Sequence, residues 1–421
     1  MERYTAVRMI GAGALMTTAA LILAGCGQGF DGDSGGGATD SGDLTSSDDA
    51  LTIMIGSSGE AETAAVEDAV AAWSEDSGLD AEVVAATNLS QELAQGFAAG
   101  SPPDLFYLST DQLAGFVDNG SVRAYGDLLD NKDDFYPSLV ANFTIDDEFV
   151  CAPKDFSTLA LIINTTLWAD AGLTDADVPT TWDELATVAQ TLTTDGRVGL
   201  AFGAEYQRVG AFMAEAGGRL VDEAGTEAVA DSSENVEALT YVKDHLADGS
   251  FAFAADIGAG WGGEAFGKQQ AAMVIEGNWI TGGLSADYPD VEYTVAELPE
   301  GPAGQGTLQF TNCWGMAADS PNQEGALDLV EYLTSTEQQL AFSDAFGPMP
   351  SIESAAADWE EANPEFAPFL AGSAYAIGIP TNVGIAEVIT DFNAQLESLA
   401  TGDPQQILQS VQSNLEAVVG G

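Results

Sequence analysis

Short apolar strands alternate with amphipathic helices over the body of the chain, and this order limits the possible folds most strongly. Apolar runs over residues 51–55, 81–86 and 105–108 each have the length of one strand, and helical periodicity fills the gaps between them. Ser57 and Glu60 stand at the spacing of a capping box, which predicts a helix start directly after the first strand. A strand–helix–strand–helix–strand order predicts a parallel sheet with crossover helices.

A similar α/β pattern returns later in the chain with different content. Residues 157–164 form a strong apolar run, residues 181–184 carry another capping-box pattern, and residues 198–202 form a further strand. The chain ends in long helical stretches over residues 385–399 and 404–419. The part of the chain after position 50 exceeds what one hydrophobic core usually holds, so we expect two α/β domains.

The N-terminus has the pattern of an export signal. Two arginines precede an apolar run over residues 9–23, which is typical of a signal peptide rather than a membrane span. The following Leu-Ala-Gly-Cys tetrapeptide resembles the lipobox of bacterial lipoproteins, in which the cysteine takes a diacylglycerol and becomes the new N-terminus. We therefore predict a signal peptide over residues 1–26, lipidation of Cys26 and a position on the extracellular face of the cytoplasmic membrane. The alternative is a free cysteine behind an ordinary signal.

Residues 27–50 consist almost entirely of Gly, Ser, Asp, Ala and Thr. Such a composition buries too little apolar surface to fold, which predicts a flexible tether that ends near Leu51. Asp31 and Asp33 suggest a calcium loop, but Gly42 occupies the position that would need a glutamate, so a solvated linker is favoured.

The chain has three cysteines. If Cys26 is lipidated, Cys151 and Cys313 remain as an even pair in an oxidising compartment, which predicts a disulfide between them. The alternative is a pair of buried free thiols.

The charge balance is strongly acidic, with 67 acidic against 10 basic residues and a formal net charge of −57. Nucleic acids and anionic lipid surfaces are excluded as partners, because both need a basic surface. The acidic residues are spread along the whole chain, which suggests adaptation to high salt, where screening removes the repulsion between them.

Several segments also resemble a known family in the expected order. They are residues 103–106 (Pro-Asp-Leu-Phe), 151–164, 167–173, 179–185, 266–273, 277–279, 314–322 and 346–350. Together they resemble the extracellular solute-binding proteins of family 1, the maltose- and oligosaccharide-binding lipoproteins of bacterial ABC importers. One departure is the Gln269-Gln270 pair, where many members of the family carry Gly-Lys.

The resemblance implies an α/β, two-lobed periplasmic-binding-protein-like fold (type II), with the lobes joined by a multi-strand hinge and the ligand cleft between them. The N-terminal lobe would hold residues 51–158 plus 312–345, and the C-terminal lobe residues 159–311 plus 350–421. Both remaining cysteines would then lie on the N-lobe side of the hinge, which supports the disulfide. The implied function is capture of a di- or oligosaccharide by a monomer without a cofactor, for delivery to a membrane permease pair and its ATPase.

A sugar site needs aromatic platforms and groups that hydrogen-bond neighbouring hydroxyls. Three of the 7 tryptophans are candidates. Trp261 lies in a glycine-rich loop, Trp279 follows a strand, and Trp314 stands near the expected hinge. Packing under a loop is the alternative for each. Of the other tryptophans, we predict structural roles for Trp73, Trp168 and Trp182 and assign none to Trp359.

The polar candidates follow strand ends or stand near the expected hinge. A helix N-terminus after the first strand offers free N–H groups to ligand oxygens, although capping is the favoured role of Ser57 and Glu60. A surface ion pair is the alternative for the arginine in the set. The predicted ligand-binding polar residues are Ser58, Asp111, Asp155, Glu205, Tyr206, Arg208, Glu276 and Asn312.

An enzyme is the main alternative function. The single histidine, His245, lies on a charged helix where a solvated face is favoured over catalysis, and the sequence has neither a G-x-S-x-G elbow nor a His-x-x-x-His pair. A secreted glycosidase needs two carboxylates and is not excluded by counting. A binding protein for a polyamine or another small polar solute is the second alternative.

Overall fold

The computed structural model describes residues 44–419. The predicted signal peptide, the predicted lipidation site at Cys26, most of the predicted tether and the Asp31–Asp33 pair lie outside the described residues. Within the described part, no helix has both the length and the apolar character that crossing a bilayer requires.

The first sheet forms from the strands predicted at the start of the body. It contains β1 (Leu51–Ile55), β2 (Ala81–Ala85), β3 (Leu105–Ser109) and β12 (Asn312–Met316), in the order β12-β3-β1-β2. The first three strands are parallel, as the alternating pattern predicts, and β12 joins β3 in the antiparallel direction. The crossover helices are α1 (Glu60–Ser77) and α2 (Leu89–Ala99), and α3 (Thr110–Asp118) follows β3.

The start of α1 differs from the predicted capping box. The N-cap is Gly59, which has no side chain to cap the helix, and the carboxylate of Glu62 reaches back from the third helical position instead. Its Oε2 accepts hydrogen bonds of 2.7 Å from both the backbone N–H and the hydroxyl of Ser58. Ser57 donates to the carbonyl of Gly59. The helix therefore begins with an acidic side chain in the place where the helix dipole favours negative charge.

The second sheet is larger, and two of its central strands are fully buried. Its strands are β6 (Ser157–Asn164), β7 (Val198–Phe202), β8 (Phe251–Phe253), β9 (Ala271–Gly277), β10 (Tyr293–Ala296), β11 (Thr307–Phe310) and β13 (Ala376–Ile377). The order is β13-β11-β6-β9-β7-β8, with β10 also paired to β6. Every residue of β6 is buried, which agrees with its continuous apolar run.

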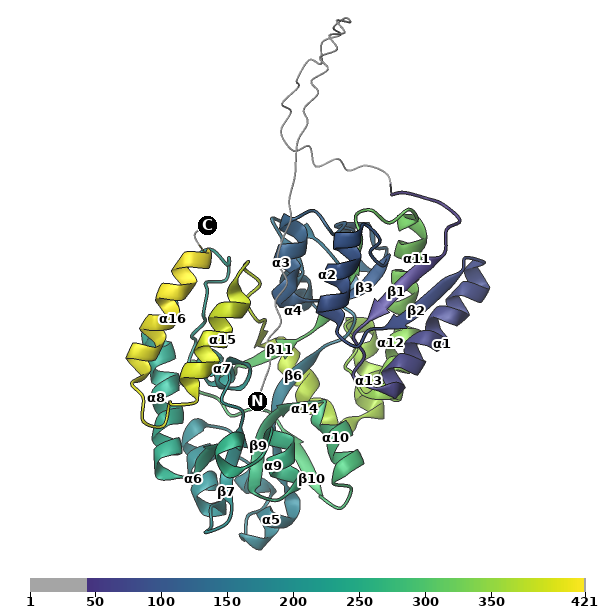
Figure 1. Ribbon diagram of the computed structural model, residues 1–421. Coiled ribbons are helices and arrows are strands. Elements are labelled where there is room, and N and C mark those ends of the chain that lie inside the picture. The colour runs from purple at the N-terminus through teal and green to yellow at the C-terminus, as the bar shows by residue number, and fades with distance from the viewer. Residues whose placement is uncertain (1–43, 420–421) are drawn as a thin grey trace, which may run out of the picture. The chain divides into compact units, whose positions relative to one another are not determined.

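Helices surround both sheets, and Figure 1 shows α1 to α3 grouped near the first sheet and α5 to α9 near the second. The remaining helices are α4 (Pro137–Asn142), α5 (Thr165–Asp170), α6 (Trp182–Leu192), α7 (Tyr206–Glu215), α8 (Ser233–Asp248), α9 (Gly262–Gly267), α10 (Ile280–Asp287), α11 (Gln323–Leu333), α12 (Thr336–Phe346), α13 (Ala356–Ala362), α14 (Ala367–Ala371), α15 (Ile385–Leu396) and α16 (Pro404–Val419). A short hairpin pairs β4 (Thr144–Ile145) with β5 (Glu148–Phe149).

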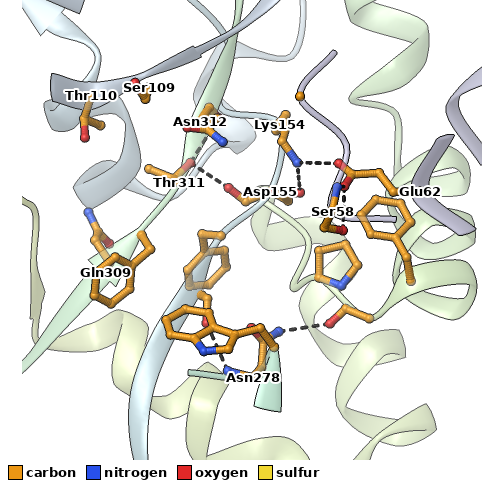
Figure 2. Close-up of a pocket in the computed structure, with 18 of the residues that line it drawn as sticks. Ser58, Glu62, Ser109, Thr110, Lys154, Asp155, Asn278, Gln309, Thr311 and Asn312 are labelled. Atoms are coloured by element: carbon orange, nitrogen blue, oxygen red, sulfur yellow. Dashed lines mark hydrogen bonds and ion pairs between the residues drawn. The ribbon is translucent and has the colours of Figure 1, made fainter. Parts of the chain in front are cut away.

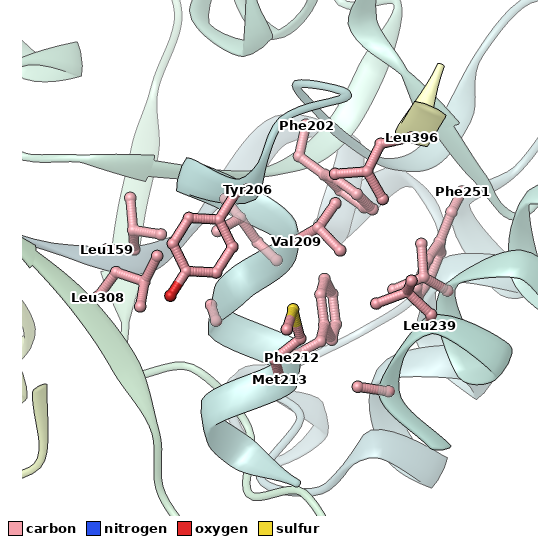
Figure 3. Close-up of a cluster of buried hydrophobic side chains, with 14 of the residues drawn as sticks. Leu159, Phe202, Tyr206, Val209, Phe212, Met213, Leu239, Phe251, Leu308 and Leu396 are labelled. Carbon is pink, nitrogen blue, oxygen red and sulfur yellow. The ribbon is translucent and has the colours of Figure 1, made fainter. Parts of the chain in front are cut away.

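The core of the second sheet is centred on α7. Figure 3 shows Phe212 and Val209 of this helix among side chains from β7, β8 and α8, and Leu396 of α15 closes the cluster. Buried residues occur on all sides of α7 rather than along a single stripe. The helix is therefore almost completely enclosed by these elements.

Residues 44–50 lie against the body, so the compact unit begins at Leu44 rather than at the predicted Leu51. The backbone N–H of Thr45 donates to Gln323, and its hydroxyl donates to the carbonyl of Ser320. Its own carbonyl accepts the N–H of Glu324 at 3.0 Å. Thr45 thus satisfies N–H groups at the start of α11 that would otherwise lack a partner.

Three chain segments run side by side where the chain passes between the two sheets. The segment before β6 pairs with β12, since the N–H of Lys154 donates to the carbonyl of Asn312. Phe156 exchanges two backbone hydrogen bonds with Met349, and Thr311 alone separates β11 from β12. These three adjacent crossings form the multi-strand connection that the family resemblance implies.

The predicted disulfide between Cys151 and Cys313 is present, with 5.7 Å between the two Cα atoms. Both cysteines are fully buried, and because they are bonded to each other the alternative of two buried free thiols does not hold. The bridge fixes β12 to the segment that enters β6, beside the crossings.

Removal of this disulfide is expected to destabilise the chain. The bridge closes a loop with a sequence separation of 162, which restricts the unfolded chain strongly. The double variant C151S/C313S should lose about 2–4 kcal/mol of unfolding free energy in urea titrations at high salt. An unchanged unfolding midpoint would contradict this role for the bridge.

A buried acid at the end of α7 is expected to make stability depend on pH. Glu215 is 1% exposed, and its carboxylate accepts a hydrogen bond from the indole N–H of Trp182 at 2.5 Å. Burial raises the pKa of Glu215 well above its ordinary value. The folded state therefore holds this proton more tightly than the unfolded chain does, and the resulting stability is complete below the unfolded pKa and is lost as pH rises through the folded pKa.

Glu215→Gln keeps the oxygen that accepts from Trp182 and removes the titration. The variant should be more stable than the wild type at pH 8, and the difference should shrink toward pH 4. Thermal unfolding across this pH range measures the effect, with Glu360→Gln at an exposed position as the matched control. Equal pH dependence of the wild type and E215Q would disprove the assignment.

Candidate functional site

A cavity of about 440 Å³ opens where elements of the two sheets meet. The first sheet contributes Ser58 after β1, Thr110 after β3 and Asn312 at the start of β12. The second contributes Asn278 and Trp279, which follow β9, together with residues of β6 and β11. The ends of β1, β3 and β9 all point to this place, as expected for a ligand site of an α/β protein. Figure 2 shows the polar side chains arranged around the space.

A buried charge cluster forms one side of the cavity. The ammonium of Lys154 lies 3.3 Å from Oε1 of Glu62 and forms a second ion pair with the carboxylate of Asp155. It also lies 4.4 Å from the ring centroid of Tyr107, whose hydroxyl donates to Glu62 at 3.0 Å. With Ser58 bound to the other oxygen of Glu62, the cluster is held from several elements at once (Figure 2).

The pKa values in this cluster follow from burial and from the ion pairs. Burial alone would raise the pKa of Glu62, but Lys154, Ser58 and Tyr107 hold it below its ordinary value. Burial outweighs Lys154 at Asp155 and raises the pKa of that carboxyl. For Lys154, burial would lower the pKa, but Asp155 and Glu62 raise it. The cluster therefore offers a fixed ammonium and two carboxyl groups, which can donate to and accept from hydroxyl groups.

Trp279 also lines the cavity and presents an aromatic surface there, with 39% of the residue exposed. Its indole N–H donates to Glu276 at 3.1 Å, and the Arg208 guanidinium lies 5.2 Å from the ring centroid. Phe310 meets the ring edge to face at 5.3 Å. A Cβ on residue 277 would come within 2.2 Å of the ring, so glycine is required there.

Arg208 and Glu276 lie behind this tryptophan rather than on the cavity wall. The guanidinium is 2.7 Å from Glu276 and 3.2 Å from Glu205. Glu276 is almost fully buried, and burial raises its pKa although Arg208 opposes the shift. The two residues hold the indole from its N–H and from its face, so they act as positioning groups for Trp279.

Four of the residues proposed from the sequence line this cavity: Ser58, Asp155, Trp279 and Asn312. Asp111 follows Thr110 on α3 and is exposed outside it. Glu205, Trp261 and Glu276 line a neighbouring cavity of about 440 Å³ at the ends of β7, β8 and β9.

Trp314 and Tyr206 are buried and do not line this cavity, although Tyr206 lines a separate cavity of about 290 Å³. Trp314 is 1% exposed and packs 4.9 Å from Tyr107, its partner on β3. Side chains two positions apart on a strand share a face, so Asn312, opposite Ser109, reaches the cavity and Trp314, opposite Tyr107, lies two residue pairs deeper. Tyr206 is the first residue of α7, and its ring packs against Phe392. Figure 3 shows Tyr206 within the cluster of buried side chains.

The structure adds lining residues that the sequence reasoning missed, namely Glu62, Lys154, Asn278, Gln309 and Phe310. Lys154 had a usable signal, because it is one of 10 basic residues and precedes Asp155 in a segment already chosen. Glu62 had none, because its role depends on the distant Lys154. Asn278 is placed by a hydrogen bond from its N–H to Ser157 and another from its amide to Gly347.

The other tryptophans and the single histidine pack among neighbouring side chains. Trp73, Trp168 and Trp182 are buried as predicted, and Trp359, left unassigned, is buried too. His245 differs from the expected solvated face, because its ring packs between Tyr241 and Phe251. Among residues 44–419, no group of three or more His, Cys, Asp or Glu side chains is arranged to hold a metal ion.

The chain is similar in sequence to known binding proteins. The profile of a family described as bacterial extracellular solute-binding protein matches residues 68–368. A protein of Brucella abortus (strain 2308), whose name describes a binding protein without a ligand, is 25% identical over 354 residues, covering 81% of this chain and 85% of the relative. The diacetylchitobiose binding protein DasA of Streptomyces coelicolor is 25% identical over 275 residues, covering 63% of this chain and 64% of that protein.

The fold is also similar to solved structures. The crystal structure of the cyclic alpha-maltosyl-1,6-maltose binding protein from Arthrobacter globiformis superposes with a TM-score of 0.78 at 22% identity, covering 88% of this chain and 99% of that one. At this identity the likeness shows the fold, and it confirms the two-lobed α/β architecture predicted from the sequence.

Proposed function

The chain belongs to the bacterial extracellular solute-binding protein family, and we propose that it captures a di- or oligosaccharide in the cavity beside Trp279 and delivers it to an ABC importer. The observation that carries the proposal is the pairing of an exposed indole with polar groups across the same cavity. A sugar ring has an apolar face that stacks on an aromatic surface and hydroxyls at its edge that need both donors and acceptors. The relatives named for a maltose-type saccharide and for diacetylchitobiose support this ligand class.

The position of the cavity supports a mechanism of closure. Its walls come from both sheets, and three adjacent chain segments connect them. In the proposed division, residues 51–158 with 312–345 form one lobe and residues 159–311 with 350–421 form the other. A ligand that contacts both lobes stabilises the closed arrangement, which is then presented to the permease pair.

The proposal includes attachment to the membrane from outside the cell. Cleavage before Cys26 and lipidation of its thiol would leave the body, from Leu44 onward, on the extracellular face of the cytoplasmic membrane as a monomer. A tether that ends at residue 43 would leave the described body free to reach the importer.

A binding role accounts for the cavity carboxylates better than catalysis does. A glycosidase needs one carboxylic acid that gives a proton and another carboxylate that acts as base or nucleophile. Here Glu62 and Asp155 both pair with the ammonium of Lys154, and Glu62 accepts three further hydrogen bonds. Both groups are thereby engaged in holding the cavity wall.

A thermal-shift screen tests the ligand class. The purified chain from residue 27 onward is heated at high salt with mono-, di- and oligosaccharides, with putrescine and spermidine, and with phosphate. Saccharides of one class should raise the unfolding midpoint, since a ligand at a hundred times its Kd stabilises by about 2.7 kcal/mol. A shift with polyamines alone would reject saccharides as the ligand class in favour of polyamines. Release of cleaved sugar on incubation would favour a glycosidase.

A further inference from the structure

The cavity beside Trp261 has no part in the proposed saccharide site. It measures about 440 Å³ and shares no lining residue with the cavity beside Trp279. Its walls are the ends of β7, β8 and β9, the start of α9 and Glu397 at the end of α15. Ligands of α/β proteins often bind at strand ends, so this cavity is a candidate site for a second ligand.

The charged side chains that line this second cavity are all acidic. They are Glu205, Asp256, Glu276 and Glu397. Arg208 lies nearby, but its single positive charge is already shared between Glu205 and Glu276. The four carboxyl groups therefore exceed the nearby positive charge, which favours a cation in the cavity.

One of these carboxyl groups has an oxygen that is free to accept a hydrogen bond. Glu276 is 1% exposed, and its hydrogen bonds from Arg208 and Trp279 all go to Oε2. Its Oε1 accepts none from the described residues and lies beside Gly262, where an added Cβ would come within 2.5 Å of it. Gly262 lines the same cavity. A buried oxygen without a donor costs free energy, so a ligand that donates a hydrogen bond is favoured here.

Trp261 adds an aromatic surface to this cavity, with 38% of the residue exposed. The ring is held against backbone, because a Cβ on residue 263 would come within 2.1 Å of it and a Cβ on residue 283 within 3.4 Å. Phe253 and Ala254 extend the apolar part of the wall. An indole face attracts a cation, and its carbon surface also packs against an apolar chain.

The arrangement fits an organic cation better than a metal ion. Among residues 44–419, no group of three or more His, Cys, Asp or Glu side chains is arranged to hold a metal ion. An organic ammonium is larger and can meet separated carboxylates and an indole face together. The free oxygen of Glu276 needs a donor, which a primary ammonium has and a quaternary ammonium lacks.

We propose that the cavity beside Trp261 binds a small primary ammonium ion with an apolar tail. The ammonium donates to Oε1 of Glu276, and the tail lies against Trp261. The site is additional to saccharide capture and does not depend on it. Since the two cavities share no lining residue, both ligands can be bound at the same time.

Calorimetric titration with butylammonium tests this site, at a fixed high concentration of potassium chloride. 1-Butanol has nearly the same shape without the charge, and tetramethylammonium has the charge without an N–H group. Each of these two should bind the wild type about tenfold more weakly than butylammonium does. Trp261→Ala should weaken the binding of butylammonium about tenfold, because it removes the indole face.

Further variants separate binding from folding. Asp256 and Glu397 are exposed, so D256N/E397Q should keep the wild-type unfolding midpoint while it weakens the binding of butylammonium. Glu360→Gln removes an exposed carboxylate away from the cavity and should bind butylammonium as the wild type does. Trp279→Ala should also retain this binding, because Trp279 does not line the cavity.

The outcomes distinguish this site from the saccharide site. The proposal is overturned if butylammonium does not bind the folded wild type, or if 1-butanol or tetramethylammonium binds equally well. Binding that W279A abolishes and W261A leaves unchanged would also overturn it, as would saturation with butylammonium that prevents a saccharide from binding. Failure of every saccharide to bind, with butylammonium still bound, would refute saccharide capture and support the second site.

Discussion

Replacing Trp279 by alanine is expected to weaken saccharide binding about a hundredfold, close to 2.7 kcal/mol, because the indole supplies the central aromatic surface of the cavity. The side chain is pre-positioned by Glu276, Arg208 and Phe310, so little conformational entropy is lost when a ligand stacks on it. Calorimetric titration with the saccharide identified by thermal shift measures the loss.

Matched variants make this prediction specific. Trp279→Phe keeps an aromatic face and should retain most of the affinity. Trp261→Ala removes an equally exposed indole, at 38% against 39%, from the neighbouring cavity and should cost less than a tenth of the effect of W279A. A larger loss with W261A than with W279A would move the site to that neighbouring cavity.

Replacing Lys154 by methionine is expected to destabilise the fold by about 3–5 kcal/mol, because it leaves the Glu62 and Asp155 carboxyl groups without their shared cation. Methionine preserves most of the side-chain volume, so the loss reports charge rather than packing. In this variant burial would raise the pKa of both carboxyls above their unfolded values. The destabilisation should therefore be small near pH 4 and should grow as the pH rises.

The triple variant K154M/E62Q/D155N is the control for this charge effect. It removes both carboxylates together with the cation, so it should recover much of the stability of K154M at pH 8 and lose the pH dependence. Urea unfolding at pH 4 and pH 8 measures both quantities. A K154M protein as stable as the wild type at pH 8 would show that the cluster contributes nothing to folding.

The two sheets could be predicted because the positions of strands and helices depend on the hydrophobic periodicity of short segments. The run that becomes β6 is apolar at every position but its ends, and the structure buries it on both faces. The disulfide was also predictable, since Cys151 and Cys313 are the pair that remains after Cys26 is set aside. These features depend on periodicity and residue counts, which one sequence contains.

The site was only partly predictable because its groups come together over long sequence separations. Lys154 meets Glu62 across 92 positions, and Thr45 caps α11 across 278. Strand ends identified Trp279 correctly as a cavity residue, but they could not show that Trp314 lies two residue pairs deeper in the sheet than Asn312. That difference depends on how far β12 extends into the first sheet, which no local pattern records.

The most direct test of saccharide capture is the position of the bound sugar in a crystal structure of the chain with the saccharide that gives the largest thermal shift. The account predicts a sugar ring stacked on Trp279 with hydroxyls bonded to residues of both sheets, including Asp155 and Asn278. Electron density for the sugar in another place, such as the cavity beside Trp261, or a ligand that contacts elements of one sheet alone, would contradict it.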